Sequence, residues 1–268
     1  MPEKIVDPVK KASAMSLPDS SILTNIIVPG RARPMDVLFE KKYIATRSLE
    51  NRLYSDEEVM RLPEIYPGHT HYREWLLRKR SCKKIVRYLS SKGRPGAILE
   101  VGCGNGWLSH RLANIPGARV TGMDINFTEL QQAARVFSDD PNLYFVHGDL
   151  RSGILGEQTF NYIVFAASIQ YFPSFKKIVH QALTYLNEGG ELHITDTHFY
   201  KTSEIELAKR RTAAYYASLG FPEMADFYFH HDVRDLESFD FKRMHNPHSL
   251  YNRVVGRKNG FPWIRIKK

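Results

Sequence analysis

Short apolar runs alternate with amphipathic segments through the middle of the chain. The runs have the length and the β-branched and aromatic content of strands, and the segments between them repeat apolar residues at helical spacing. The predicted strands are residues 97–102, 119–125, 143–149, 160–169 and 191–199. This alternation is typical of βαβ units, and it predicts an α/β three-layer sandwich whose mostly parallel sheet has helices on both faces.

The predicted helices between these strands carry start and stop signals. Residues 107–114 follow a glycine-rich turn, and Asn126 is placed to cap the next helix, with Glu129 three residues on as in a capping box. Pro173 opens a third helix, and Gly189-Gly190 is expected to stop it before the last of these strands.

The flanking sequence predicts further elements around this core. Residues 71–93 have the pattern of an amphipathic helix with basic residues on its outer side, and residues 203–219 predict another helix. Residues 227–231 resemble a strand, and residues 262–266 predict a short closing strand.

These patterns divide the chain into two parts. Residues 1–70 are expected to form an N-terminal arm or cap with a helical extension, and the start of this segment is polar and punctuated by proline. Residues 71–268 are expected to form one α/β domain, with its core at 97–200 and C-terminal strands and a loop at 201–268.

Composition narrows the class of protein. The chain has 268 residues, 43% of them hydrophobic, which suffices for an ordinary buried core, and no apolar run is long enough to span a membrane. Its first residues lack the apolar segment of a secretory signal. Cys82 and Cys103 make neither a disulfide framework nor a zinc site, so a reducing, cytoplasmic location is expected.

The net charge of +9 is unevenly distributed. Residues 1–96 and 201–268 are basic, whereas residues 97–200 are mildly acidic. Basic flanks can attract nucleic acid, anionic lipid or an acidic substrate. No basic cluster is interleaved with stacking aromatic residues, so a solvated basic surface is favoured over a nucleic-acid groove.

The stretch ILEVGCGNGWLS, residues 98–109, ends a predicted strand in three closely spaced glycines. At the carboxyl end of a parallel strand, Gly102, Gly104 and Gly106 favour a ligand site, because glycine lets the backbone approach a ligand closely. The third glycine comes one residue too early for the usual dinucleotide motif, and Glu100 would repel a pyrophosphate. A ligand with a cationic group suits this acid better.

Two more acids follow predicted strands. Asp124 ends the second strand, about 20 residues after Gly102, where a carboxylate can accept hydrogen bonds from ribose hydroxyls. Asp149 ends the third strand, where its carboxylate can accept a hydrogen bond from an adenine amino group.

Together these motifs resemble those of the class I S-adenosylmethionine-dependent methyltransferases. The matching stretches are Glu100 to Gly106, Asp124, Gly148 to Leu150 and Leu186 to Gly190, within residues 72–199. The resemblance implies a Rossmann-like fold with a seven-stranded, mostly parallel sheet, and S-adenosyl-L-methionine as the cofactor. Within the family, the chain is similar to the metal-independent branch that acts on small molecules.

The resemblance also assigns individual positions to the cofactor. Glu100 would lie near the cofactor's amino group, Asp124 would bind the ribose, and Asp149 would frame the adenine. Ala166 and Ser168 would form the floor beside the sulfonium. The assigned positions are Glu100, Gly102, Cys103, Gly104, Gly106, Asp124, Ile125, Asp149, Leu150, Ala166 and Ser168.

The acceptor is inferred by exclusion. The fourth predicted strand leads into AASIQYF, residues 166–172, and not into the Asn/Asp-Pro-Pro-aromatic box of enzymes that methylate exocyclic base amines. A small molecule methylated on O, N or C by in-line displacement is therefore the leading expectation. The alternatives are an RNA methyltransferase that uses the basic flanks, and a catalytically inactive cofactor-binding module.

A catalytic base is needed only if the acceptor must lose a proton. Asp196 and His198 lie at the end of the fifth predicted strand, and His198 is the first candidate because histidine titrates near neutrality. Tyr171 is a candidate for orienting the acceptor. Histidine clusters at 69–71 and 230–231 match no metal-ligand spacing, so no metal is expected.

Overall fold

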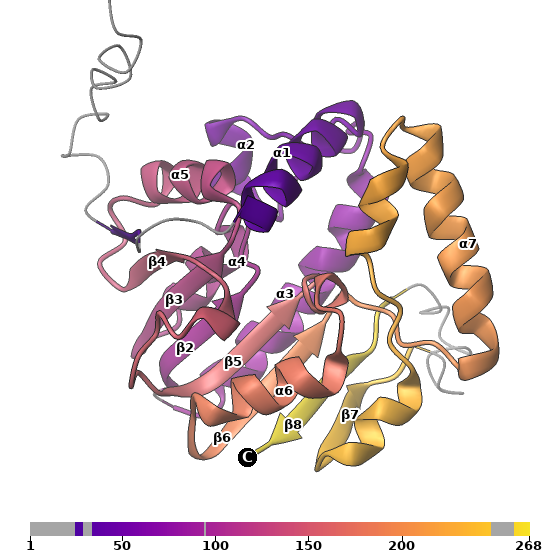
Figure 1. Cartoon of the computed structure of the whole chain (residues 1–268). Coiled ribbons are helices and arrows are strands. Elements are labelled where there is room, and N and C mark those ends of the chain that lie inside the picture. Colours follow the sequence, from indigo (N-terminus) through magenta and orange to yellow (C-terminus); the bar gives the residue numbers. More distant parts are fainter. Residues whose placement is uncertain (1–24, 29–33, 94, 248–259) are drawn as a thin grey trace, which may run out of the picture.

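An eight-stranded sheet forms the centre of the molecule, in the order β1-β4-β3-β2-β5-β6-β8-β7 (Figure 1). The computed structural model describes residues 25–28, 34–93, 95–247 and 260–268. The strands are β1 Ile26–Ile27, β2 Gly96–Val101, β3 Ala118–Asp124, β4 Leu143–His147, β5 Phe160–Ala166, β6 Leu186–Thr195, β7 Phe241–His245 and β8 Trp263–Lys267. Strands β1 to β6 pair in parallel, whereas β8 is antiparallel to both β6 and β7.

Helices lie on both faces of this sheet, as the sequence predicts. The α-helices are α1 Pro34–Leu49, α2 Asp56–Arg61, α3 Tyr72–Ser90, α4 Trp107–Ala113, α5 Phe127–Val136, α6 Phe175–Thr184 and α7 Thr202–Ser218. Short 3₁₀ helices include η2 Leu150–Ser152, η3 Ile169–Tyr171, η4 Pro222–Phe227 and η5 Val233–Ser238. The fold is thus α/β, and its sheet is mostly parallel. It has one strand more than expected, because the two-residue β1 adds to the free edge of β4.

Neighbouring residues of β2 belong to opposite layers of the core, since side chains alternate across a strand. Ile98 packs in a buried cluster with residues of α3, α4 and α5, whereas Leu99 packs in another with residues of α6. Val59 of α2 and Leu62, which directly follows α2, belong to the first cluster. The predicted boundary near residue 70 remains a prediction, and residues 1–24 of the expected arm lie outside the described residues.

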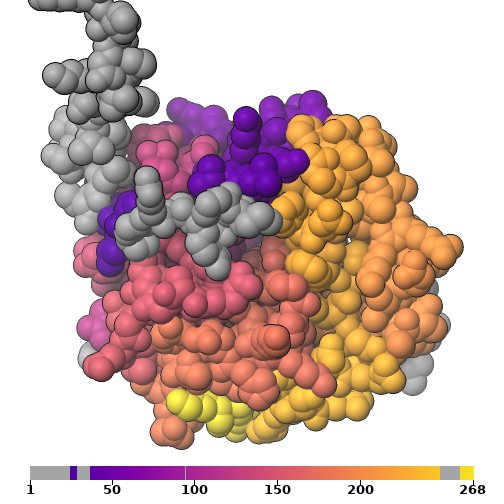
Figure 2. Space-filling view, viewed as in Figure 1, coloured from indigo at the N-terminus to yellow at the C-terminus, as the bar shows by residue number. Residues whose placement is uncertain are grey.

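A third cluster lies above the carboxyl ends of the strands and joins segments distant in sequence. Phe39 of α1, Tyr216 of α7 and Met224 of η4 are buried together. Lys42 of α1 also pairs with Glu223 of η4. In Figure 2 the indigo surface of α1 lies against the golden surface of η4. These segments close over the sheet at the end where ligands bind in parallel α/β folds.

Some predicted boundaries are wrong. Helix α6 ends at Thr184, and Gly189-Gly190 lies inside β6, next to a register shift between β5 and β6. Residues 227–231 form no strand, because they leave η4 as irregular chain whose aromatic side chains Phe227 and Tyr228 pack against the third cluster. Within the described part of the chain, no helix is long and apolar enough to cross a membrane.

Candidate active site

The glycine-rich turn connects β2 to α4 and forms the floor of a groove. Gly102 has a φ of +75°, and a Cβ there would lie 2.4 Å from the Cβ of Ser168. Gly104 has a φ of +53°, and its N–H donates to Asp124 Oδ2 at 2.7 Å. Only glycine meets both the backbone conformation and the close approach at position 102. The turn therefore lies directly beneath the groove at the ends of β2 and β3.

The groove collects most of the positions predicted for the cofactor. Its lining includes Gly102, Gly104, Asp124, Ile125, Asp149, Leu150 and Ser168. A second cavity, the inner pocket, adjoins it and is lined by Glu100, Cys103, Trp107 and Ala166 among others. Gly106 lies outside the linings of both. It begins α4 with a φ of +74°, where a Cβ would be 2.8 Å from the Phe145 ring, so its observed role is in packing.

Three carboxyl groups surround the turn, of which Glu100 is buried and Asp124 and Glu129 are half-buried. Glu100 accepts a hydrogen bond from Ser109 Oγ at 2.5 Å, yet burial, with the charge of Asp124, raises the pKa of Glu100 to about 8. Burial and the same charge raise the pKa of Glu129 to about 7. Burial also raises the pKa of Asp124, although backbone N–H groups oppose the shift. Together these acids create a site that favours a cationic group.

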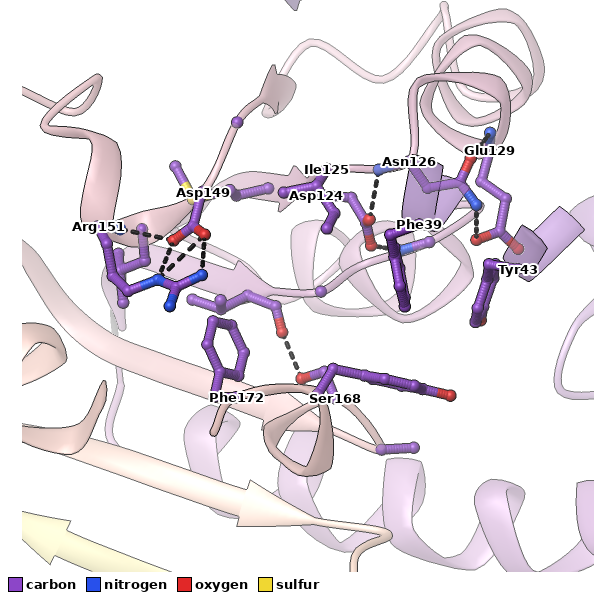
Figure 3. A pocket seen from close by; sticks show the side chains of 18 residues that line it. Phe39, Tyr43, Asp124, Ile125, Asn126, Glu129, Asp149, Arg151, Ser168 and Phe172 are labelled. Carbon is purple, nitrogen blue, oxygen red and sulfur yellow. Dashed lines mark hydrogen bonds and ion pairs between the residues drawn. The ribbon is translucent and has the colours of Figure 1, made fainter. Parts of the chain in front are cut away.

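The far end of the groove carries an ion pair. The Asp149 carboxylate accepts from Arg151 Nε at 2.9 Å and from the Arg151 backbone N–H at 2.8 Å. The Arg151 guanidinium lies 5.7 Å from the centre of the Phe172 ring. Figure 3 shows this pair at one end of the groove, Glu129 at the other and Asp124 between them. The carboxylate predicted to meet adenine is thus already engaged by its own neighbour.

A third and wider cavity, the chamber, has a volume of about 500 Å³. Tyr171 lines both the groove and the chamber, and Ala167 lines the groove, the inner pocket and the chamber. Ala167, directly after β5, has a φ of +54°, a conformation that costs a residue with a side chain about 1–3 kcal/mol. The three cavities therefore meet at one strained residue.

The chamber brings together the three residues predicted for catalysis. Asp196 is buried just after β6 with a φ of +57°, and it accepts a hydrogen bond from Ser81 Oγ at 2.7 Å. Burial raises the pKa of Asp196. His198 is exposed, with its ring 4.7 Å from that of Phe261, and burial raises the pKa of Tyr171. The more enclosed candidate base is therefore Asp196.

Residues 98–190, which contain the glycine turn and all three groove carboxylates, match a family described as a methyltransferase domain. The chain carries a class I S-adenosylmethionine-dependent methyltransferase domain. This domain has the α/β fold and the motif order that the sequence predicts.

Several known proteins are similar to this chain. A malonyl-[acyl-carrier protein] O-methyltransferase of Halalkalibacterium halodurans is 27% identical over 160 residues, which are 55% of this chain and 57% of that protein. A demethylmenaquinone methyltransferase of Chlorobaculum tepidum is 27% identical over 116 residues, 43% of this chain and 46% of that protein. The chain spans about half the length of the curated relatives it matches.

Among solved structures, magnesium protoporphyrin IX methyltransferase of Synechocystis PCC 6803 with bound S-adenosylmethionine superposes with a TM-score of 0.59. It is 14% identical, and the match covers 90% of this chain and 100% of that one. At this identity the likeness establishes the fold.

Sequence motifs did not reveal the residues of the N-terminal segment that cover the groove. Phe39 and Tyr43 of α1 line the groove, and Arg47 lines the inner pocket and the chamber. Arg47 donates to the Tyr43 hydroxyl at 2.8 Å. These three residues are spaced by four, which places them on one face of a helix, and that spacing is the signal that predicts their common direction.

The predicted histidine clusters make ordinary hydrogen bonds. His71 Nε2 lies 2.7 Å from Glu50 O, His230 Nε2 lies 2.9 Å from Thr212 Oγ1, and His231 Nε2 lies 3.0 Å from Ile169 O. Within the residues that the structure describes, no group of three His, Cys, Asp or Glu side chains is arranged to hold a metal ion.

Proposed function

We propose that the protein transfers a methyl group from S-adenosyl-L-methionine to an O, N or C atom of a small-molecule acceptor by in-line displacement. The observation that carries this proposal is the meeting of the groove, the inner pocket and the chamber at Ala167. A donor in the first two and an acceptor in the third would be adjacent at one point, as displacement requires.

The residues present fit such a cofactor. Glu100 and Glu129 supply negative charge for a cationic amino group, and Gly102 and Gly104 let the backbone approach closely. Asp124 keeps acceptor capacity for ribose hydroxyls beyond the backbone N–H groups that it already binds. When bound, the cofactor supplies the methyl group on a cationic sulfur. The protein's own residues then need only to align donor and acceptor, exclude water from the site and deprotonate an acceptor that must lose a proton.

The chain's own groups divide these tasks. Tyr171, wedged against the rings of Phe39 and Tyr43, would orient the acceptor at the border between groove and chamber. Asp196 or His198 would take a proton from a hydroxyl or amine acceptor, and neither is needed for an acceptor that is already anionic.

Calorimetry on the purified protein tests the donor. S-adenosylhomocysteine should bind while NAD should not, and Asp124→Ala should weaken S-adenosylhomocysteine binding at least about tenfold. Tight NAD binding, or unchanged affinity in the variant, would overturn the assignment of the groove.

Turnover separates an enzyme from an inactive cofactor-binding module. S-adenosylhomocysteine formation should be measured across a panel of phenols, amines, carboxylic acids and activated carbon acids. Acceptor-dependent product is expected. Binding of the cofactor with no turnover on any class would favour the inactive module.

A further inference from the structure

The chamber is richer in cations than its acids can neutralise. Arg47, Arg52, Arg78 and Arg211 line it, together with Glu50, Glu74 and Asp196. The first three arginines share the two glutamates. Arg47 Nη1 lies 3.1 Å from Glu50, Arg52 Nη2 lies 2.7 Å from Glu74, and Arg78 Nη2 lies 2.9 Å from Glu74. The remaining acid, Asp196, accepts from Ser81.

One buried donor in this network makes no well-formed hydrogen bond. Arg52 donates twice to Glu74, at 3.0 and 2.7 Å, and its buried Nε lies 3.3 Å from Glu50 Oε2 without the geometry of a hydrogen bond. An anionic oxygen in the cavity would satisfy this N–H more fully. Arg52 also lines the inner pocket, so the carboxylate of a methionyl group could account for this donor.

The methionyl carboxylate that could meet Arg52 does not account for Arg211. This second arginine belongs to α7, and it lines the chamber without lining the groove or the inner pocket. Arg211 is exposed to solvent at the chamber, and within the described residues no hydrogen bond or ion pair engages its guanidinium. Its neighbour Arg210 lies outside the chamber and pairs with Glu206 at 3.4 Å. A guanidinium at this position can act on the chamber's own ligand.

Aromatic side chains supply the rest of the wall. Tyr171 and Tyr228 have their ring centres 5.9 Å apart in an edge-to-face arrangement, and His198 faces Phe261. Tyr200, Tyr215 and Tyr216 also line the chamber. Rings of this kind contact flat apolar surfaces and offer hydroxyl groups at their edges. The lining therefore combines aromatic faces with surplus positive charge.

We propose that the acceptor is an aromatic acid, a flat ring system bearing an anionic carboxylate that Arg211 recognises. This inference rests on the proposed function and names the substrate class of its chamber. Arg211 acts as a specificity-determining residue at the side of the chamber formed by α7. The ring lies among the tyrosines, and the atom to be methylated faces Ala167.

Matched acids and amides test the proposal on the full-length protein loaded with S-adenosylhomocysteine. The probes are 3,4-dihydroxybenzoate, 4-hydroxycinnamate and 1-hydroxy-2-naphthoate, each compared with its neutral amide by calorimetry. At least one acid should bind at about 1 mM or better, and at least about tenfold more tightly than its amide.

Variants assign the preference to one residue. Arg211→Gln should bring acid and amide to equal affinity, Arg211→Lys should restore part of the difference, and Arg210→Gln should leave it unchanged. Melting temperatures of the three variants show whether each is folded, and a loss of folding in Arg211→Gln leaves the lysine variant and the parent ratio as the test.

These experiments distinguish a failure of the proposed function from a failure of this inference alone. If S-adenosylhomocysteine itself does not bind, the proposed function and this inference both fall. If it binds but no acid is preferred over its amide, or if Arg211→Gln keeps the full preference, only the inference is overturned.

Discussion

At the scale of single residues, Glu100 has the strongest consequence, because its charge depends on what occupies the inner pocket. Burial holds its pKa at about 8 when no cation is near, so the carboxyl is largely protonated at neutral pH. A ligand ammonium group would favour the ionised form. Binding and proton release are therefore linked.

This linkage gives the first prediction. Binding of S-adenosylhomocysteine near pH 7 should release up to about one proton, which calorimetry in two buffers of different ionisation enthalpy would detect. Affinity should rise between about pH 6 and about pH 8, because the proton is lost more easily as pH increases. Glu100→Gln should abolish much of the release and weaken binding. A full proton release in that variant would assign the titration to another group.

The second prediction separates the two candidate bases. Asp196 is enclosed next to Ser81, whereas His198 lies at the exposed edge of the chamber. With an acceptor that must lose a proton, Asp196→Asn should lower kcat at least about 100-fold while leaving S-adenosylhomocysteine affinity unchanged. His198→Ala should lower turnover as well, but less. Full activity of either variant with such an acceptor would remove that residue from the mechanism.

Residue motifs alone predicted a large part of the groove. Gly102 and Asp124 of the groove, and Glu100 of the adjoining inner pocket, were found because each lies at or near the carboxyl end of a strand, and parallel strands bring such ends together. Glu129 was noticed only for capping, where Asn126 Oδ1 indeed accepts its backbone N–H at 3.1 Å, yet its carboxyl group also faces the groove. No pattern along the chain indicates that the Glu129 side chain also lines the groove.

At the scale of elements, helix α1 contributes most to the groove from outside the sheet. Tyr43 places a ring 5.9 Å from that of Tyr171 and accepts a hydrogen bond from Arg47. The helix therefore ties the groove lining to the cationic side of the chamber through one side chain.

The third prediction follows from this position. Tyr43→Ala should expose the groove and remove the hydrogen bond from Arg47, which keeps its ion pair with Glu50, and it should weaken S-adenosylhomocysteine binding about tenfold. Tyr43→Phe keeps the ring and loses only the hydroxyl, so it should cost much less. Equal losses in the two variants would show that the hydroxyl, and not the ring, is what matters; no loss in either would mean that α1 is dispensable for binding.

Local pattern predicted the core strands and helix α7 well, whereas the strand expected at residues 227–231 is wrong. Strands β2 to β6 are recognisable because apolar runs between layers of helix admit few alternatives. Residues 227–231 have the same local composition, but their rings are drawn into the cluster of Phe39, Tyr216 and Met224. That contact joins residues nearly two hundred positions apart, and no short window contains it.

At the scale of the whole molecule, the acids around the glycine turn whose pKa is raised oppose folding when no ligand is bound. A carboxyl whose folded pKa is raised binds protons more tightly in the folded state, so its ionisation destabilises the fold as pH increases toward that pKa. For Glu100 this interval runs from the ordinary value of 4.5 to about 8.

The fourth prediction is a loss of stability on the alkaline side of neutrality. Between about pH 6.5 and about pH 8 the free energy of unfolding of the ligand-free protein should fall by roughly 1–2 kcal/mol. Glu100→Gln should flatten the change, and thermal unfolding followed by circular dichroism measures both. A rise in stability over the same interval would show that groups other than the groove carboxyls dominate.

The position of Ala167 also governs the order of events. Because this residue borders the groove, the inner pocket and the chamber, a donor occupying the first two would complete one wall of the third. The acceptor would then meet a finished surface only after the donor has bound, and each would tighten the other's binding by the same factor. The architecture thus favours a compulsory sequence, with the donor first to enter and its demethylated product last to leave.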